Sequence, residues 1–306
     1  MLAIKVLLCM MTFIFLPIIS MAKRLPNRSR RNNAYQQPVG KWFSRIMIIM
    51  LENTDYDVAL EDPYFTQLAQ DGMLLDNYFG VTHPSKGNYI AQIYGSYGDL
   101  RDDGPTTFQG ESLVDLLENS HLTWKAYQED YPGDCFLGNT DMYFEKHNPF
   151  ISMRNIRTNL ERCDQIVNGE ELETDILLNT LPNVIYYTPN TLNDGHDTGI
   201  QYASKWLHDF LEEKLDDSNF MEDMLVVVTF DERGSFETLD DPDNRVLTIL
   251  LGPPVEEEDL MQVTDSTEYD HYSLLRTIEE NWSLGTLGRN DSTAIPFQNL
   301  IPLISG

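Results

Sequence analysis

Four runs of apolar residues along this chain predict buried β-strands. They cover residues 46–51, 184–188, 225–230 and 246–251. Such runs carry few polar side chains, which is typical of strands that are covered on both faces in a parallel sheet. We therefore expect these four segments to be strands of a sheet.

Apolar residues recur at helical spacing between and after these strands. Residues 273–282 show this periodicity, and residues 199–215 place six apolar side chains on one face, those of Ile200, Ala203, Trp206, Leu207, Phe210 and Leu211. Strands that alternate with helices predict an α/β three-layer sandwich with a mainly parallel central sheet.

The domain boundaries follow from composition. We find no internal repeat or low-complexity linker in residues 46–306, so we expect a single domain there. Residues 98–182 are richer in turn-forming and polar residues, and we expect them to form an insertion or cap over the functional site.

The first 22 residues read as a secretory signal peptide. Lys5 precedes an apolar stretch from Val6 to Ile19, and Ser20-Met21-Ala22 fits a cleavage site between small residues. We therefore expect a secreted, extracellular protein without a stable membrane anchor. The alternative is an uncleaved anchor, for which this stretch is short.

Charge is distributed unevenly along the chain. The formal net charge is −28, yet residues 23–45 contain seven basic residues and no acidic one. We expect this segment to be a basic disordered arm, either a solvated linker or a processed pro-segment. The acidic remainder repels nucleic acid at long range, so we expect no nucleic-acid binding.

In a secreted protein, cysteines can form disulfides and asparagine sequons can be glycosylated. Cys9 leaves with the signal peptide, and Cys135 and Cys163 are predicted to form a disulfide; two free buried thiols are the alternative. Sequons for N-glycosylation stand at Asn27, Asn281 and Asn290.

Two pairs of polar residues come directly after predicted strands. Glu52-Asn53 follows the strand 46–51, and Asp231-Glu232 follows the strand 225–230. Ligands bind outside the carboxyl ends of strands in open α/β sheets. Because carboxylates are hard oxygen ligands, these acids predict a site for one divalent cation.

Ser85 precedes a predicted helix over residues 89–94. The first turn of a helix offers unpaired N–H groups that favour an anion, although a serine in this position can simply cap the helix. A cation bound by Glu52, Asp231 and Glu232 could hold the Ser85 oxygen as an alkoxide and make it a nucleophile.

Two histidines stand beside aspartates in predicted loops, in Asn193-Asp194-Gly195-His196-Asp197 and in Asp270-His271. The plain alternatives are a structural role for each histidine and a helix-capping role for Asp197. We assign His196 to phosphate binding and His271 to protonation of the leaving group. An unperturbed histidine carries its proton only below about pH 6.5, so we expect activity to peak below neutral pH.

Seven stretches, in order along about 240 residues, resemble the phosphoesterase family of secreted acid phosphatases and bacterial-type phospholipases C, within the alkaline phosphatase superfamily. They are MIIMLEN (47–53), VTHPSKGNY (81–89), WKAYQEDYPGDC (124–135), HNPFISMRNI (147–156), LPNVIYYTPNTLNDGHDTG (181–199), VVVTFDE (226–232) and YDHYSLLRTIEENWSLGTLG (269–288).

The resemblance implies roles for particular residues. Ser85 matches the nucleophile that becomes phosphorylated, whereas His83 matches no assigned role. Lys86-Gly87 stands where many relatives have another residue followed by proline. The implied metal and phosphate site comprises Glu52, Asn53, Ser85, Asn88, His196, Asp231, Glu232 and His271.

The resemblance implies a secreted, metal-dependent acid phosphatase that hydrolyses phosphate monoesters of small molecules through a phosphoserine intermediate. One alternative is a phosphodiesterase of phospholipase C type. Another is a catalytically inactive binding protein on the same scaffold. The formylglycine signature of sulfatases is absent around Ser85.

Overall fold

The computed structural model describes residues 38–236, 238–239, 241, 243–255 and 263–303. The described residues form one compact unit. Its strands are β1 (Arg45–Leu51), β2 (Met73–Leu75), β3 (Tyr78–Phe79), β4 (Trp124–Gln128), β5 (Ile166–Asn168), β6 (Val184–Thr188), β7 (Met224–Phe230), β8 (Thr248–Leu251), β9 (Val263–Asp265) and β10 (Tyr269–Asp270).

Eight of these strands form the central sheet, in the order β5-β4-β6-β1-β7-β8-β2-β9, and β3 and β10 form a small second sheet. Strands β5, β4, β6, β1 and β7 run parallel, whereas β8 is antiparallel to both of its neighbours. Every residue of β1 and β7 is buried. The predicted mainly parallel sheet is confirmed, and the four apolar runs form its strands β6, β1, β7 and β8.

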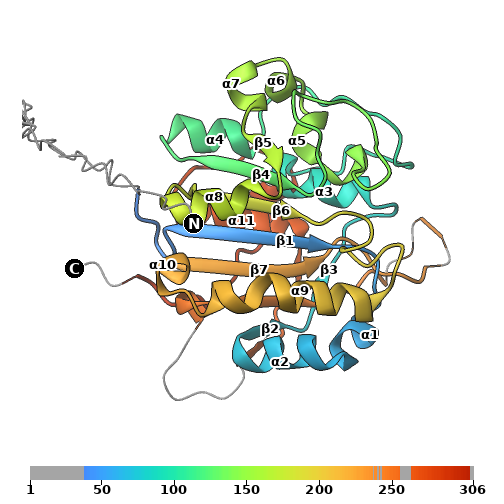
Figure 1. Cartoon of the computed structure of the whole chain (residues 1–306), viewed down its shortest axis with the longest axis vertical. Coiled ribbons are helices and arrows are strands. Elements are labelled where there is room, and N and C mark those ends of the chain that lie inside the picture. The colour runs from blue at the N-terminus through green and yellow to red at the C-terminus, as the bar shows by residue number, and fades with distance from the viewer. Residues whose placement is uncertain (1–37, 237, 240, 242, 256–262, 304–306) are drawn as a thin grey trace, which may run out of the picture. The chain divides into compact units, whose positions relative to one another are not determined.

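Helices cover both faces of this sheet, as Figure 1 shows with α9 in front and α11 behind. Of the six apolar residues predicted to share one face of α9, Trp206 and Phe210 are partly buried and the other four are buried. The helices are α1 (Tyr56–Glu61), α2 (Pro63–Asp71), α3 (Lys86–Tyr94), α4 (Leu113–Asn119), η1 (Glu145–His147), α5 (Pro149–Ser152), α6 (Arg154–Arg157), α7 (Leu160–Cys163), α8 (Glu171–Leu178), α9 (Ile200–Leu215), α10 (Ser218–Met221), η2 (Pro253–Val255), α11 (His271–Asn281) and η3 (Asn290–Ser292).

Residues 98–182 are more than an insertion or cap. They supply β4 and β5, which extend the central sheet beyond β6. The prediction missed them because β4 is half polar and β5 has only three residues, so neither produces a long apolar run. This corrects the expected domain organisation.

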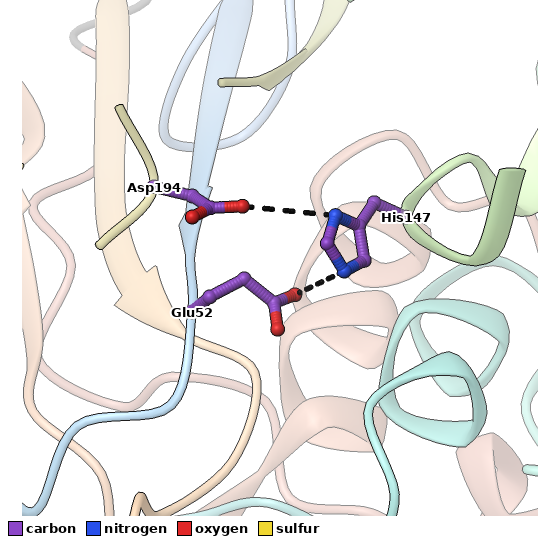
Figure 2. Close-up of side chains that lie close together, drawn as sticks. All are labelled: Glu52, His147 and Asp194. Atoms are coloured by element: carbon purple, nitrogen blue, oxygen red, sulfur yellow. Dashed lines mark ion pairs between the residues drawn. The ribbon is translucent and has the colours of Figure 1, made fainter. Parts of the chain in front are cut away.

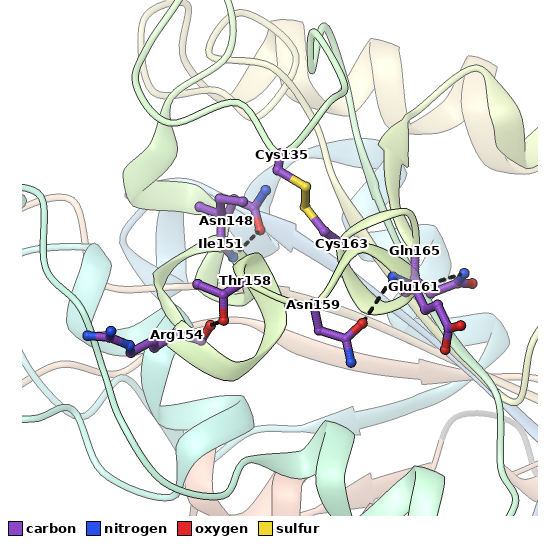
Figure 3. The surroundings of a disulfide bond; sticks show 9 residues. All are labelled: Cys135, Asn148, Ile151, Arg154, Thr158, Asn159, Glu161, Cys163 and Gln165. Atoms are coloured by element: carbon purple, nitrogen blue, oxygen red, sulfur yellow. Dashed lines mark hydrogen bonds between the residues drawn. A yellow bond between two sulfur atoms is a disulfide. The ribbon is translucent and has the colours of Figure 1, made fainter.

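The predicted disulfide between Cys135 and Cys163 is confirmed, with a Cα–Cα distance of 5.8 Å. Figure 3 shows that it joins the loop after β4 to the end of α7. Cys163 is buried. The bond therefore links the two ends of the long connection between β4 and β5.

The expected disordered arm over residues 23–45 is wrong for its last part. Trp42 and Phe43 are buried in the core, and β1 already begins at Arg45. The side chain of Asn281 accepts hydrogen bonds from the backbone N–H groups of Trp42 and Phe43, at 2.8 and 3.2 Å. It also donates to the carbonyl of Phe43 at 2.9 Å.

Asn281 therefore does not present its amide for glycosylation in the folded protein, which corrects that assignment. Asn290 is exposed, and its glycosylation stays a prediction. The expected signal peptide over residues 1–22, the arm over 23–37 and the sequon at Asn27 lie outside the described residues. Within the part of the chain that the structure describes, no helix has the length and apolar character needed to cross a membrane.

Candidate active site

Three neighbouring strands deliver acidic residues to one edge of the sheet. Strand β1 lies between β6 and β7, all three running parallel, and Glu52 and Asp231 follow β1 and β7. Asp194 belongs to the turn after β6. Backbone hydrogen bonds hold the strand ends together, from Glu52 N–H to the Asp194 carbonyl at 3.0 Å and from Asp231 N–H to the Leu51 carbonyl at 3.0 Å.

Ser85 stands at the N-terminal end of α3, opposite these strand ends. Its backbone is already helical, and among the described residues its side chain makes no capping hydrogen bond. The plain capping role therefore does not account for it. The Asn88 side chain shapes the loop before it, accepting from the N–H groups of Val81 and Thr82 at 2.8 and 3.2 Å and donating to the Thr82 carbonyl at 2.8 Å.

The Ser85 hydroxyl faces three acceptors at once. Its oxygen lies 3.1 Å from Glu52 Oε2 and 3.0 Å from Glu232 Oε1. Asn53 Oδ1 lies 3.4 Å away. A hydroxyl has one proton to donate, so it satisfies only one of these acceptors at a time. The remaining oxygen-rich surroundings suit a cation.

Burial raises the pKa values of two of these acids, because no counter-charge fully compensates the loss of water around them. Burial raises the pKa of Glu52 to about 7, against the opposing effect of the Lys146 ammonium. Burial and the charges of Glu52 and Glu232 raise the pKa of Asp231 well above its ordinary value. Asp231 Oδ2 is buried and has no hydrogen-bond partner among the described residues. The cation site predicted from Glu52, Asp231 and Glu232 stays a proposal. Among the described residues, the group of possible ligands whose atoms lie within 4.8 Å of one another is Glu52, His147 and Asp194.

The two candidate asparagines have different environments. Asn53 is partly exposed, and its side-chain amide donates to Glu232 Oε1 at 3.0 Å. Asn88 is fully buried, and both ends of its amide are used in the loop bonds described above. The assignment of Asn88 to phosphate binding is therefore corrected to bracing of the loop that carries Ser85.

His271 does not face the Ser85 hydroxyl. It is completely buried, and its Nε2–H donates to the backbone carbonyl of Asp231 at 2.6 Å. Its Nδ1 lies 3.1 Å from both the Tyr78 hydroxyl and the Gln92 amide nitrogen. Burial lowers the pKa of His271 to about 4, so the ring is neutral. These contacts do not support the assigned role of His271 as proton donor; they show that it braces the strand end that carries Asp231.

His196 lies at the exposed side of the site. Its Nδ1 lies 2.7 Å from Asp197 Oδ1, and its backbone N–H donates to Asp194 Oδ1 at 2.8 Å. The charge of His196 acts on Glu52, whose pKa it lowers. This location is compatible with phosphate binding, which stays a proposal.

Sequence reasoning missed several residues of the site. His147, from η1, lies with its Nε2 3.2 Å from Glu52 Oε1 and its Nδ1 3.7 Å from Asp194 Oδ2 (Figure 2). Tyr89 donates its hydroxyl proton to Glu52 Oε1 at 2.5 Å and stacks on the His147 ring. The available signal was His147 in the stretch HNPFISMRNI, which carried no assigned role.

Lys146 and Asp103 also belong to this region. The Lys146 ammonium lies 3.3 Å from Asp103 Oδ2, and Asp103 Oδ1 accepts the backbone N–H of Lys86 at 3.0 Å. The helix N–H group expected to favour a substrate anion is therefore held by a carboxylate of the protein itself. Burial lowers the pKa of Lys146, but the charges of Glu52 and Asp103 outweigh it, so the pKa is raised and the ammonium stays charged.

His83 completes the surroundings of Glu232. Its Nδ1 contacts Glu232 Oε2, and its ring stacks on Phe236 with centroids 4.0 Å apart. The His83 side chain is buried. Glu232 is therefore held on one oxygen by His83 and on the other by Asn53.

Comparisons with known proteins identify the family of this chain. The model of the phosphoesterase family matches residues 58–285. The chain is 42% identical to a probable acid phosphatase of Kluyveromyces lactis over 83% of this chain and 62% of that protein. It is 36% identical to a phosphate-repressible acid phosphatase of Penicillium chrysogenum over 87% and 64%. The chain therefore spans about three fifths of the length of these relatives.

The fold is similar to that of a crystal structure from Vibrio parahaemolyticus described as a protein in the alkaline phosphatase superfamily. The TM-score is 0.56 at 10% sequence identity, over 86% of this chain and 73% of the other. The expected alkaline phosphatase-like fold is therefore confirmed. Because the family model covers most of the chain, the protein belongs to the phosphoesterase family.

Proposed function

We propose that this protein is a metal-dependent phosphatase of the acid phosphatase type, which hydrolyses phosphate monoesters with Ser85 as its nucleophile. The observation that carries the proposal is the Ser85 oxygen, 3.1 Å from Glu52 Oε2 and 3.0 Å from Glu232 Oε1, at the carboxyl edge of a parallel sheet. The named activity of the fungal relatives supports the choice of monoesters.

The reaction has two steps. The Ser85 hydroxyl gives up its proton and its oxygen forms a bond to phosphorus, while the bond between phosphorus and the leaving oxygen breaks. The leaving oxygen takes up one proton, so the step consumes no net proton. Water then attacks the phosphoserine, releasing inorganic phosphate and restoring the hydroxyl. A divalent cation, when bound, stabilises the deprotonated serine oxygen and the charge that develops on the phosphoryl oxygens.

The chain's own residues orient these groups. Glu52 and Glu232 would hold the cation together with Asp231, and each has an oxygen within hydrogen-bonding distance of the Ser85 hydroxyl. Asn53 keeps Glu232 in position through its amide, 3.0 Å from Oε1, and its partial exposure lets it meet a phosphate oxygen. His196, at the exposed side, is proposed to bind a second phosphate oxygen.

The proposal includes the location and partners of the protein. A chain with this leader and a disulfide fits a secreted, extracellular enzyme. Its net charge of −28 disfavours nucleic acid, and small phosphorylated molecules are the expected substrates.

A substrate panel tests the function. Purified protein would be assayed with a chromogenic phosphate monoester, a chromogenic phosphate diester and a chromogenic sulfate ester, each with and without chelator. We expect rapid monoester hydrolysis that chelator abolishes. Preference for the diester would indicate a phospholipase C type enzyme. Absence of turnover with all three esters, at any added divalent metal, would indicate an inactive binding protein.

A further inference from the structure

Glu52 uses its two carboxylate oxygens for two different sets of neighbours. Oε2 faces Ser85, whereas Oε1 lies 3.2 Å from His147 Nε2. Figure 2 shows that Asp194 approaches the other nitrogen of the same ring, with 3.7 Å between Oδ2 and Nδ1. One ligand atom from each of Glu52, His147 and Asp194 lies within 4.8 Å of the others, and all three residues are buried.

Hydrogen bonding alone does not satisfy these three side chains. His147 Nε2 and Asp194 Oδ2 are both buried without a hydrogen-bond partner among the residues that the structure describes. Both ring nitrogens of His147 face a carboxylate oxygen, Nε2 that of Glu52 and Nδ1 that of Asp194. A neutral imidazole has one donor and one acceptor nitrogen. With a carboxylate at each nitrogen, one of the two contacts brings two acceptors together.

The nearby ammonium group is already paired with another acid. Glu52 and Asp194 are both buried, whereas the Lys146 ammonium lies 3.3 Å from Asp103 Oδ2. A divalent cation between Glu52 and Asp194 would supply the positive charge that Lys146 shares with Asp103.

We propose that Glu52, His147 and Asp194 hold a second divalent cation beside the one at Ser85, with Glu52 contributing an oxygen to each. This inference rests on the proposed metal-dependent site, because the two positions share Glu52. One imidazole nitrogen with two carboxylates suits Zn²⁺ or Mn²⁺ better than Mg²⁺ or Ca²⁺, which prefer oxygen ligands alone.

Metal stoichiometry tests the proposal without recourse to activity. Protein stripped with chelator would be dialysed against Zn²⁺, and the bound metal per chain measured by mass spectrometry. Asp194→Asn is isosteric and keeps an oxygen to accept the His196 N–H, so it should fold. His147→Gln removes the imidazole, and Glu232→Gln weakens the position at Ser85. His208→Gln is the matched control, because His208 also faces acids, Asp209 and Glu212, but on the exposed surface of α9.

We expect two Zn²⁺ per chain in the wild type and in His208→Gln, and one in Asp194→Asn, His147→Gln and Glu232→Gln. With Mn²⁺, electron paramagnetic resonance should show two coupled ions in the wild type and an uncoupled ion in Asp194→Asn. One metal per chain in the wild type, or two in Asp194→Asn, would overturn the proposal; the acids then hold protons instead. Two bound metals without phosphatase activity would refute the proposed function and leave this site standing.

Discussion

Glu232 holds the Ser85 hydroxyl 3.0 Å from its Oε1, across 147 residues of sequence. The same carboxylate receives the Asn53 amide on Oε1 and contacts His83 through Oε2. Glu232 is therefore fixed on both oxygens, and the proposed nucleophile, Ser85, is positioned by the residue after strand β7 as well as by its own helix. This relationship makes the roles of individual residues testable.

Replacing Ser85 with alanine should abolish turnover and leave the fold intact. Loss of a covalent nucleophile typically lowers the rate by roughly three orders of magnitude or more. Steady-state kinetics on a chromogenic monoester measures the loss. Ser96→Ala, just beyond the C-terminal end of α3, is the control and should keep wild-type rates. Near-normal activity in Ser85→Ala would remove Ser85 from its role, and Thr82 would become the candidate.

Removal of metal should lower both activity and stability, reversibly. A ligand that binds only the folded state stabilises it by mass action, by about 2.7 kcal/mol at a concentration of 100 Kd. We expect the unfolding midpoint to fall on dialysis against chelator and to recover, together with activity, when a divalent ion is restored. Full activity of demonstrably metal-free protein would contradict the proposed site.

The two candidate histidines should separate in their effects. His271→Asn removes the donor to the Asp231 carbonyl from a buried site, so it should destabilise the protein by about 1–3 kcal/mol. It should leave the acidic limb of the pH–rate profile in place, because the His271 ring is neutral down to about pH 4. His196→Asn should keep the unfolding midpoint and reduce kcat/KM. Loss of the acidic limb in His271→Asn alone would restore His271 as proton donor.

Glu279 should make stability fall as pH rises. It is fully buried on α11, and burial together with the Asp291 carboxylate raises its pKa from 4.5 to about 8. Between these values the folded protein keeps a proton that the unfolded chain releases. Its contribution to stability is therefore fully present below about pH 4.5 and is lost as pH rises through about 8.

Glu279→Gln removes this titration, so at pH 9 the variant should be more stable than the wild type by about 1 kcal/mol or more, since one pKa unit corresponds to about 1.4 kcal/mol. Denaturant unfolding at pH 5 and pH 9 measures the difference. Both Glu279 and Glu280 pair with Arg276, at 3.5 and 3.0 Å. Glu280→Gln is therefore the control, because the side chain of Glu280 is partly exposed. Equal pH dependence in the wild type and Glu279→Gln would exclude Glu279 as the cause.

The disulfide should contribute substantially to stability. Cys135 and Cys163 are 28 residues apart, and closing a loop of that length stabilises by about 3–4 kcal/mol on the chain-entropy estimate. Replacing both cysteines with alanine should lower the free energy of unfolding by that order, and reduction of the wild type should have a similar effect. Two reactive thiols in unfolded, unreduced protein would show that the bond does not form.

The sequence by itself determined the centre of the fold and its acidic edge. Strands β1 and β7 are buried on both faces, so their residues form long apolar runs, and Glu52 and Asp231 stand out where those runs stop. Ser85 was identified by the stretch VTHPSKGNY, which resembles the family, and by its place before a predicted helix. Local patterns were sufficient here because burial and strand ends leave a continuous signal in a short window.

Only the tertiary structure decided which side chains meet. Nothing local distinguishes His271, buried behind Asp231, from His147, which lies against Glu52, because each is a single histidine beside a polar residue. Asn281 likewise fits a glycosylation sequon, yet its amide binds the backbone of Trp42 and Phe43, 238 or more residues away. Such roles depend on long-range packing, which sets burial, hydrogen-bond partners and pKa values. The residues in such contacts are far apart in the sequence, so no short sequence window contains both partners.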